Sequence, residues 1–204
     1  MILNNLQKIK DLRVISRTSV EQYRNQVKPI PEIARELRVN YIVEGNGQKY
    51  GNAFRLRTQL IMAARETHLW GESYQKKVTD IEDIFGVQTQ IAEAIAGELK
   101  AKLTAEEKKL IKKIPTDKLE TYDYYLKGQF NWRKLTEKDF DISLKYFELA
   151  REEVPNFGLA YTGICQVWLG RLQMGFTSPD VAGLLAYEEA MKALELDNTS
   201  AEVH

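Results

Sequence analysis

The residue types that most often do chemistry are scarce and scattered in this sequence. His68 is the one histidine away from the chain end, and it alternates with Trp70 and Glu72 in a run typical of a β-strand. It could act as a metal ligand or as a base, but no second histidine or cysteine lies near it in the sequence. Metal and acid–base sites need several converging groups, so a structural surface role is favoured for His68.

Cys165 is the single cysteine among 204 residues, which excludes an internal disulfide and a cysteine-rich metal site. Its neighbours are apolar residues in a segment with helical periodicity. We interpret it as a small residue at a helix contact, because a nucleophilic thiol would need a lowered pKa and a nearby base. The sequence therefore predicts no catalytic residue, no metal and no cofactor.

Two further patterns resemble binding motifs. Gly45-Asn46-Gly47 looks like a fragment of a phosphate loop, but it lacks the full glycine spacing and a following helix, so a bulge or a close strand approach is favoured. A lysine-rich run at 108–113 follows two glutamates and is typical of a solvated helix. The same interpretation applies to Arg55 and Arg57, which share one strand face.

The composition limits the classes of partner. The 29 basic and 29 acidic residues cancel, so no overall field attracts nucleic acid or an anionic membrane. No apolar run reaches the roughly 18–20 residues of a membrane span. We expect a chain that is soluble as given, with no nucleic-acid binding and no membrane insertion; the compartment, cytoplasmic or periplasmic, stays open.

A cluster of aromatic residues provides the best candidates for binding a protein or peptide. The rings between positions 122 and 132 recur at helical spacing, so some of them must lie in the core. Those left on an open side would be anchors for a peptide or a partner helix. The candidate partner-binding residues are Tyr122, Tyr125, Phe130, Trp132 and Trp168.

These aromatics belong to a helical pattern that recurs at an offset of 43 residues. Small, apolar and helix-ending positions repeat together: Ser143, Phe147, Ala150 and Pro155 in the first copy, and Ala186, Ala190, Ala193 and Asn198 in the second. Stacked helical hairpins produce such recurrence. We expect helices at about 119–132, 139–153, 157–173 and 179–196, in a region spanning 117–204 that ends at the start of a third copy.

The first part of the chain, 1–113, has a different pattern. Leu12–Ser19 is expected to be a strand that pairs in parallel with Tyr41–Glu44 through a right-handed helical crossover. Antiparallel strands should follow up to Tyr74, with tight turns at Gly51-Asn52 and at Ala63–Glu66. A capping-box pattern at Thr79 predicts a helix over 79–103, and a second at Thr104 predicts a shorter one. The fold class is therefore α+β: a small mixed α/β sheet domain followed by an all-α helical-hairpin array.

Three segments of the first part resemble a bacterial domain family, the TolB-amino-terminal-like (FlgO-like) domain. They are Tyr41-Ile42-Val43-Glu44-Gly45, Leu69-Trp70-Gly71-Glu72 and Asp83-Ile84-Phe85, and the resemblance covers roughly Leu3 to Leu103. This domain often precedes tetratricopeptide repeats, and the helical hairpins resemble those repeats, whose period is about 34 residues. The longer offset here implies extra residues in the loops. Asn198 stands where the repeat family favours proline, and Ser143 where it favours alanine.

The resemblance implies a function. In that family the domain sits in larger signalling proteins beside adenylate cyclase, winged-helix or kinase domains, and no catalytic motif of these is present in this sequence. We expect a non-enzymatic protein–protein interaction or sensor module of a bacterial signalling or envelope-associated protein, which binds a peptide or protein in the helical groove. The alternative is the regulatory portion of a class III adenylate cyclase or of a winged-helix transcriptional regulator.

One departure from the family concerns the start of the sheet. Family members usually begin with an apolar strand that precedes the first helix, whereas this chain begins inside that helix. The sheet is then expected to have an open edge. Either the chain is a truncated fragment, or a second copy in a homo-oligomer covers that edge.

Overall fold

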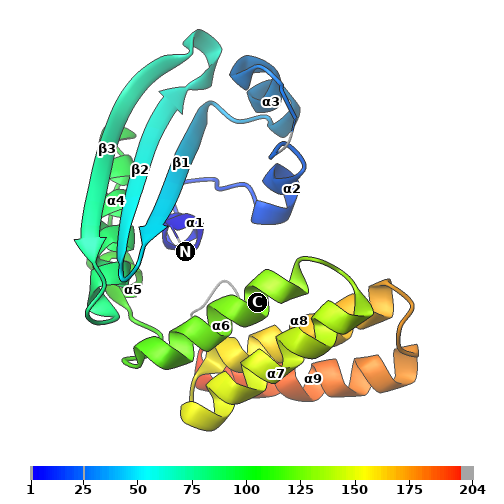
Figure 1. Ribbon diagram of the computed structural model, residues 1–204. Coiled ribbons are helices and arrows are strands. Elements are labelled where there is room, and N and C mark those ends of the chain that lie inside the picture. The colour runs from blue at the N-terminus through cyan, green and yellow to red at the C-terminus, as the bar shows by residue number, and fades with distance from the viewer. Residues whose placement is uncertain (1, 25, 199–204) are drawn as a thin grey trace. The chain divides into compact units, whose positions relative to one another are not determined.

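The computed structural model describes residues 2–24 and 26–198 and divides them into two compact units, with the division between Lys113 and Ile114 (Figure 1). The first unit contains a three-stranded sheet with helices, and the second contains helices alone. The predicted α+β class is confirmed. The expected start of a third helical repeat falls on 199–204 and lies outside the described residues.

The sheet of the first unit is antiparallel throughout. Its strands β1 (Tyr41–Tyr50), β2 (Ala53–Met62) and β3 (Thr67–Lys77) lie in the order β1-β2-β3. Tyr50 pairs with Ala53 across the two-residue loop, in which Gly51 has a φ of 55°, a region that favours glycine. A 3₁₀ turn, η1 (Ala63–Arg65), joins β2 to β3. Both predicted turns are confirmed.

Helix α4 (Glu82–Glu98) covers one face of this sheet (Figure 1). Its apolar stripe packs with β2 and with the short helices α1 (Ile2–Gln7) and α5 (Ala105–Lys112). The buried residues of this core are Leu6, Ile9, Leu60, Val87, Ile91, Ala92, Ile95, Ala96 and Ile111.

The predicted helix over 79–103 is shorter at both ends. The helix begins at Glu82 after the N-cap residue Ile81, so the capping box predicted at Thr79 does not form. The Thr79 backbone N–H and hydroxyl instead donate to the Asp83 carboxylate, and the Asp83 N–H donates to the Asp80 carboxylate. At the other end, Lys100 has a φ of 54° and the Ala101 N–H donates to the Ala96 carbonyl, which ends the helix. The second predicted capping box, Thr104 with Glu107, is confirmed.

The predicted strand at Leu12–Ser19 is wrong, and with it the parallel pair and the crossover that would make the sheet mixed. Residues 12–15 lie outside regular structure, and the Ser16 hydroxyl accepts the Ser19 N–H to begin helix α2 (Arg17–Glu21). A side-chain cap that starts a helix is favoured over a strand where no second strand is available to pair with the segment. Helix α3 (Ile30–Leu37) then leads into β1. In the described residues no strand lies on the other side of β1.

The second unit consists of two helical hairpins. Helix α6 (Leu119–Trp132) packs against α7 (Glu137–Glu153), and α8 (Gly158–Gln173) packs against α9 (Pro179–Leu196). These bounds agree with the predicted helices to within two residues. Helix α7 also packs against α8, which joins the hairpins.

Close contacts between these helices depend on small residues. A Cβ at Gly128 of α6 or at Gly163 of α8 would come within 2.5 Å of the Phe147 ring on α7. The Ser143 hydroxyl, also on α7, donates to the Gly128 carbonyl at 2.9 Å. The two glycines therefore allow α6 and α8 to pack closely on Phe147. The recurring positions are mostly buried: Ser143, Phe147, Ala150, Ala186 and Ala193.

Candidate partner-binding surface

The structure separates the five aromatic candidates by their environment. Tyr122 and Tyr125 are only 3% and 5% exposed. The Tyr125 ring lies 5.8 Å, centroid to centroid, from Phe147 and from Phe157, and meets Phe157 edge-on. These two tyrosines are part of the hairpin core, and a partner on the surface of this conformation does not reach them.

Trp132 and Trp168 are half-buried. The Trp132 indole N–H donates to the Gln166 carbonyl at 3.0 Å, so this ring connects α6 to α8. Trp168 lies beside the Arg171 guanidinium, whose central carbon is 5.6 Å from the ring centroid. Both rings have a structural contact inside the unit and offer only part of their surface to a partner.

Phe130 is the exposed member of the set. Its side chain is 64% exposed on α6, and the Lys134 ammonium lies 4.8 Å from the ring centroid. An exposed phenylalanine does not stabilise the hairpin core by burial. It is therefore the predicted residue that is best placed to contact a partner.

Three partly exposed leucines of α6 and α8 were not among the residues that the sequence singled out. Gly128 and Gly163 face α7, so residues well away from them around each helix lie on the side turned away from α7. A hydrogen bond from the Gln129 side-chain amide to the Gln166 side-chain carbonyl connects α6 to α8. The apolar residues on this side, which we name the α6–α8 surface, are Leu119, Leu126, Phe130 and Leu169, exposed by 37%, 41%, 64% and 44%.

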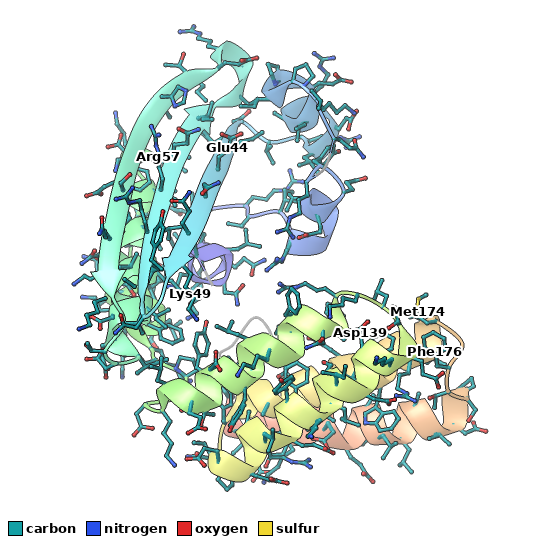
Figure 2. The ribbon with its side chains drawn as sticks, viewed as in Figure 1. Glu44, Lys49, Arg57, Asp139, Met174 and Phe176 are labelled. Carbon is teal, nitrogen blue, oxygen red and sulfur yellow. The ribbon has the colours of Figure 1, made fainter. Side chains whose placement is uncertain are left out.

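A second apolar stripe lies on α9. Its buried side consists of small residues, such as Ala182, Ala186 and Ala193. The opposite side, which we name the α9 outer face, carries Val181, Leu184, Tyr187 and Met191, exposed by 48% to 64%. The sequence of α9 indicates this exposed stripe, because the helix is apolar on both sides, whereas a surface helix normally has one apolar stripe. Met174 and Phe176 extend from the connection between α8 and α9 (Figure 2).

The residues considered for chemistry do not converge. His68 is exposed on β3, near Arg57 and Glu72 in a shallow pocket of about 250 Å³. Partial burial raises the pKa of the Cys165 thiol, and the Glu189 carboxylate raises it further. This thiol is therefore protonated at neutral pH and is a poor nucleophile. Gly45-Asn46-Gly47 lies within β1.

The described residues were also compared with the requirements of metal and membrane sites. They hold no group of three or more histidine, cysteine, aspartate or glutamate side chains that could bind a metal ion. Within the same residues, each helix is either too short or too polar to cross a bilayer.

Comparison with known proteins yields one informative similarity. The chain is 37% identical over 106 residues to a protein of Rhizobium meliloti (strain 1021) named "Putative adenylate cyclase 3". The matched stretch is 52% of this chain and only 18% of the length of that relative. No family model matches the chain, and no solved structure matches it significantly.

Proposed function

We propose that this chain is a non-enzymatic protein-binding module whose second unit binds an apolar peptide or helix on the α6–α8 surface. The observation that carries the proposal is the exposure of Phe130, the aromatic ring of that surface, together with three partly exposed leucines on the same two helices. Apolar side chains gathered on one side of a helical scaffold are typical of a surface that binds an amphipathic partner.

The architecture supports this proposal. The two hairpins resemble degenerate tetratricopeptide repeats in two features. Buried positions recur at an offset of 43 residues, and glycines of α6 and α8 pack against the Phe147 ring. Such arrays present extended surfaces that bind partners. The first unit, with its antiparallel meander covered by α4, is proposed to be the TolB-amino-terminal-like domain.

The test compares two residues of equal exposure. A displayed library of peptides of about 15 residues, enough for an amphipathic helix of four turns, is selected for binding to the 204-residue chain. Their affinity is then measured by fluorescence anisotropy for the wild type, Phe130→Ser and Tyr187→Ser. Tyr187 is also 64% exposed but lies on the α9 outer face. Because a partner would bury the Phe130 ring on binding, Phe130→Ser alone should weaken binding about tenfold or more. Loss only in Tyr187→Ser would move the site to α9.

The second candidate is a regulatory portion of a larger protein related to adenylate cyclases. The similarity to the Rhizobium meliloti protein favours it, and the matched stretch covers less than a fifth of that protein's length. Deletion of the matching region from the relative should change its rate of cyclic AMP formation from ATP. The isolated 204-residue chain should form no cyclic AMP, and an unchanged rate in the deletion protein would count against a regulatory role.

A further inference from the structure

A β-bulge between β2 and β3 decides which side chains of β3 lie on the sheet face turned away from α4. Leu60 pairs with Trp70, but the next residue of β2, Ile61, pairs with His68. Leu69 is therefore the extra residue of the bulge. A bulge of this kind re-aims a side chain to the other face of its strand. His68 thus shares the outer face of the sheet with Ile61, while Trp70 stays on the α4 face.

Four polar side chains from the two strands gather on this outer face. Arg57 pairs with Ser73, and Gln59 pairs with Gly71, so these residues share one face with each other. Together with His68 they line a shallow hollow of about 250 Å³. Figure 2 shows Arg57 on β2. A guanidinium, an amide, a hydroxyl and an imidazole, each able to donate a hydrogen bond, therefore surround one space.

Gly71 forms the floor of this space, which we name the Gly71 hollow. It lies between His68 and Ser73 along β3, and its φ is outside the positive region that favours glycine. A Cβ at Gly71 would lie 3.5 Å from the Gln59 Cβ, which is an ordinary van der Waals distance. Neither the backbone nor the packing requires a glycine here. A glycine inside a strand weakens it and often marks a place where a ligand approaches the backbone closely.

The carboxylates near the Gly71 hollow have other partners. Glu72 is one of the lining residues, but the register puts it on the α4 face, where its carboxylate accepts the Tyr74 hydroxyl at 2.8 Å. Glu44 of β1 does not line the hollow, and it accepts one hydrogen of the Gln59 amide at 2.7 Å. In the described part of the chain, no carboxylate forms an ion pair with Arg57. Its guanidinium is therefore available to an anion.

The number of donors indicates the kind of anion. The two oxygens of a carboxylate are satisfied by one guanidinium, which donates to both as a fork. The hollow offers three more donors beside that fork, and they suit the three terminal oxygens of a phosphate monoester. The first unit is also basic as a whole, since 1–113 contains 20 lysines and arginines against 14 aspartates and glutamates. This balance favours the approach of an anion.

We propose that the Gly71 hollow binds the phosphate group of a small-molecule phosphate monoester. The Arg57 guanidinium donates to two of its oxygens, and Ser73, Gln59 and His68 donate to the remaining lone pairs. Gly71 leaves the room that the phosphate occupies against the strand. The site lies in the first unit and is separate from the α6–α8 surface, so its test is independent of the proposed protein-binding function.

The test uses phenyl phosphate as the probe and the full 204-residue chain labelled with ¹⁵N. Phenyl phosphate replaces sodium chloride at constant ionic strength, and NMR spectra follow the backbone amides and the arginine side-chain N–H groups. We expect saturable shifts confined to 57–61, 68–73 and the Arg57 side chain, with a dissociation constant in the millimolar range. Acetate should bind at least about tenfold more weakly, because its two oxygens leave several of the donors unused.

Two arginine variants provide a matched comparison. Arg57→Gln removes the guanidinium from the hollow and should weaken binding of phenyl phosphate by at least about tenfold. Arg55→Gln removes the same charge from the same face of β2. Arg55 donates to the Gln75 side chain at 3.1 Å and does not line the hollow, so its loss should change the affinity by less than about threefold.

A third variant tests the hollow itself. Gly71→Val fills the space from its floor with a residue that suits a strand, so the sheet should fold while binding is lost. Circular dichroism and the amide spectrum check that this variant and the two arginine variants fold.

Several results would overturn the proposal. They are the absence of saturable shifts at high millimolar phenyl phosphate, equal weakening in Arg57→Gln and Arg55→Gln, or unchanged binding by a folded Gly71→Val. Equal weakening would show a general attraction of anions to the basic unit. Binding of inorganic phosphate without binding of phenyl phosphate would contradict the assignment to an ester.

Discussion

The indole N–H of Trp132 donates a 3.0 Å hydrogen bond to the backbone carbonyl of Gln166, and this bond ties the first helical hairpin to the second. The two residues are 34 positions apart in the chain. Trp132 thus has a structural role between helices, although its residue type alone suggested a binding anchor.

Replacing this tryptophan should weaken the second unit. Trp132→Phe keeps an aromatic ring but removes the donor, so the free energy of unfolding should fall by about 1 kcal/mol, the usual net value of a hydrogen bond. Trp168→Phe is the control, because the Trp168 ring is also half-buried but packs beside Arg171. Urea unfolding followed by circular dichroism measures both; equal losses would argue against a specific role for the bond.

Two glycine substitutions should have opposite effects on stability. Gly163→Ala places a methyl group 2.5 Å from the Phe147 ring, and we expect a loss of about 1–3 kcal/mol from overpacking, which exceeds the helix-propensity gain of alanine. Gly183→Ala on α9 has nothing within 4 Å of the new Cβ and should gain up to about 1 kcal/mol. Thermal unfolding measures both shifts, and a stabilised Gly163→Ala would contradict the close helix contact.

Two aromatic residues of α6 that lie on different sides of the helix should differ sharply in their effect on stability. Tyr125→Ala removes a ring that is 5% exposed and packs on Phe147 and Phe157, so a loss of about 3–5 kcal/mol is expected. Phe130→Ala removes a ring that is 64% exposed and should change stability by less than about 0.5 kcal/mol. Denaturant titration of the two variants checks the assignment of Tyr125 to the core and Phe130 to the surface.

The first unit should lose stability in acid through Glu107. Its carboxylate accepts the Lys10 N–H at 2.9 Å, and also the N–H and hydroxyl of Thr104. The Lys10 N–H, followed by the Thr104 donors, lowers the pKa of Glu107 below its ordinary value of 4.5. A lowered folded-state pKa stabilises the fold above the unfolded value, and this contribution disappears as the pH falls through the folded pKa.

The variant Glu107→Gln should therefore unfold more easily than the wild type at pH 7, and this difference should shrink as the pH falls below 4.5. Hydrogen–deuterium exchange of the backbone amides in 2–24 and 82–112 reports the unfolding of the first unit separately from that of the second. Glu106→Gln, at an exposed neighbouring position, is the control and should show no such trend. A constant difference from pH 7 to pH 3 would exclude the carboxylate hydrogen bonds as its cause.

The sequence by itself predicted the features that depend on neighbouring residues. The helices of the second unit, the Thr104–Glu107 capping box and the Gly51-Asn52 hairpin loop are local, because periodicity, a side-chain cap and a positive φ each involve residues a few positions apart.

Tertiary structure decided the features that depend on distant partners. Leu12–Ser19 has an alternating pattern, but a strand forms only where a second strand supplies its ladder, and the Ser16 cap forms without one. Tyr125 and Phe130 lie on one helix with similar composition around them, yet α7 and α8 bury one ring and leave the other exposed.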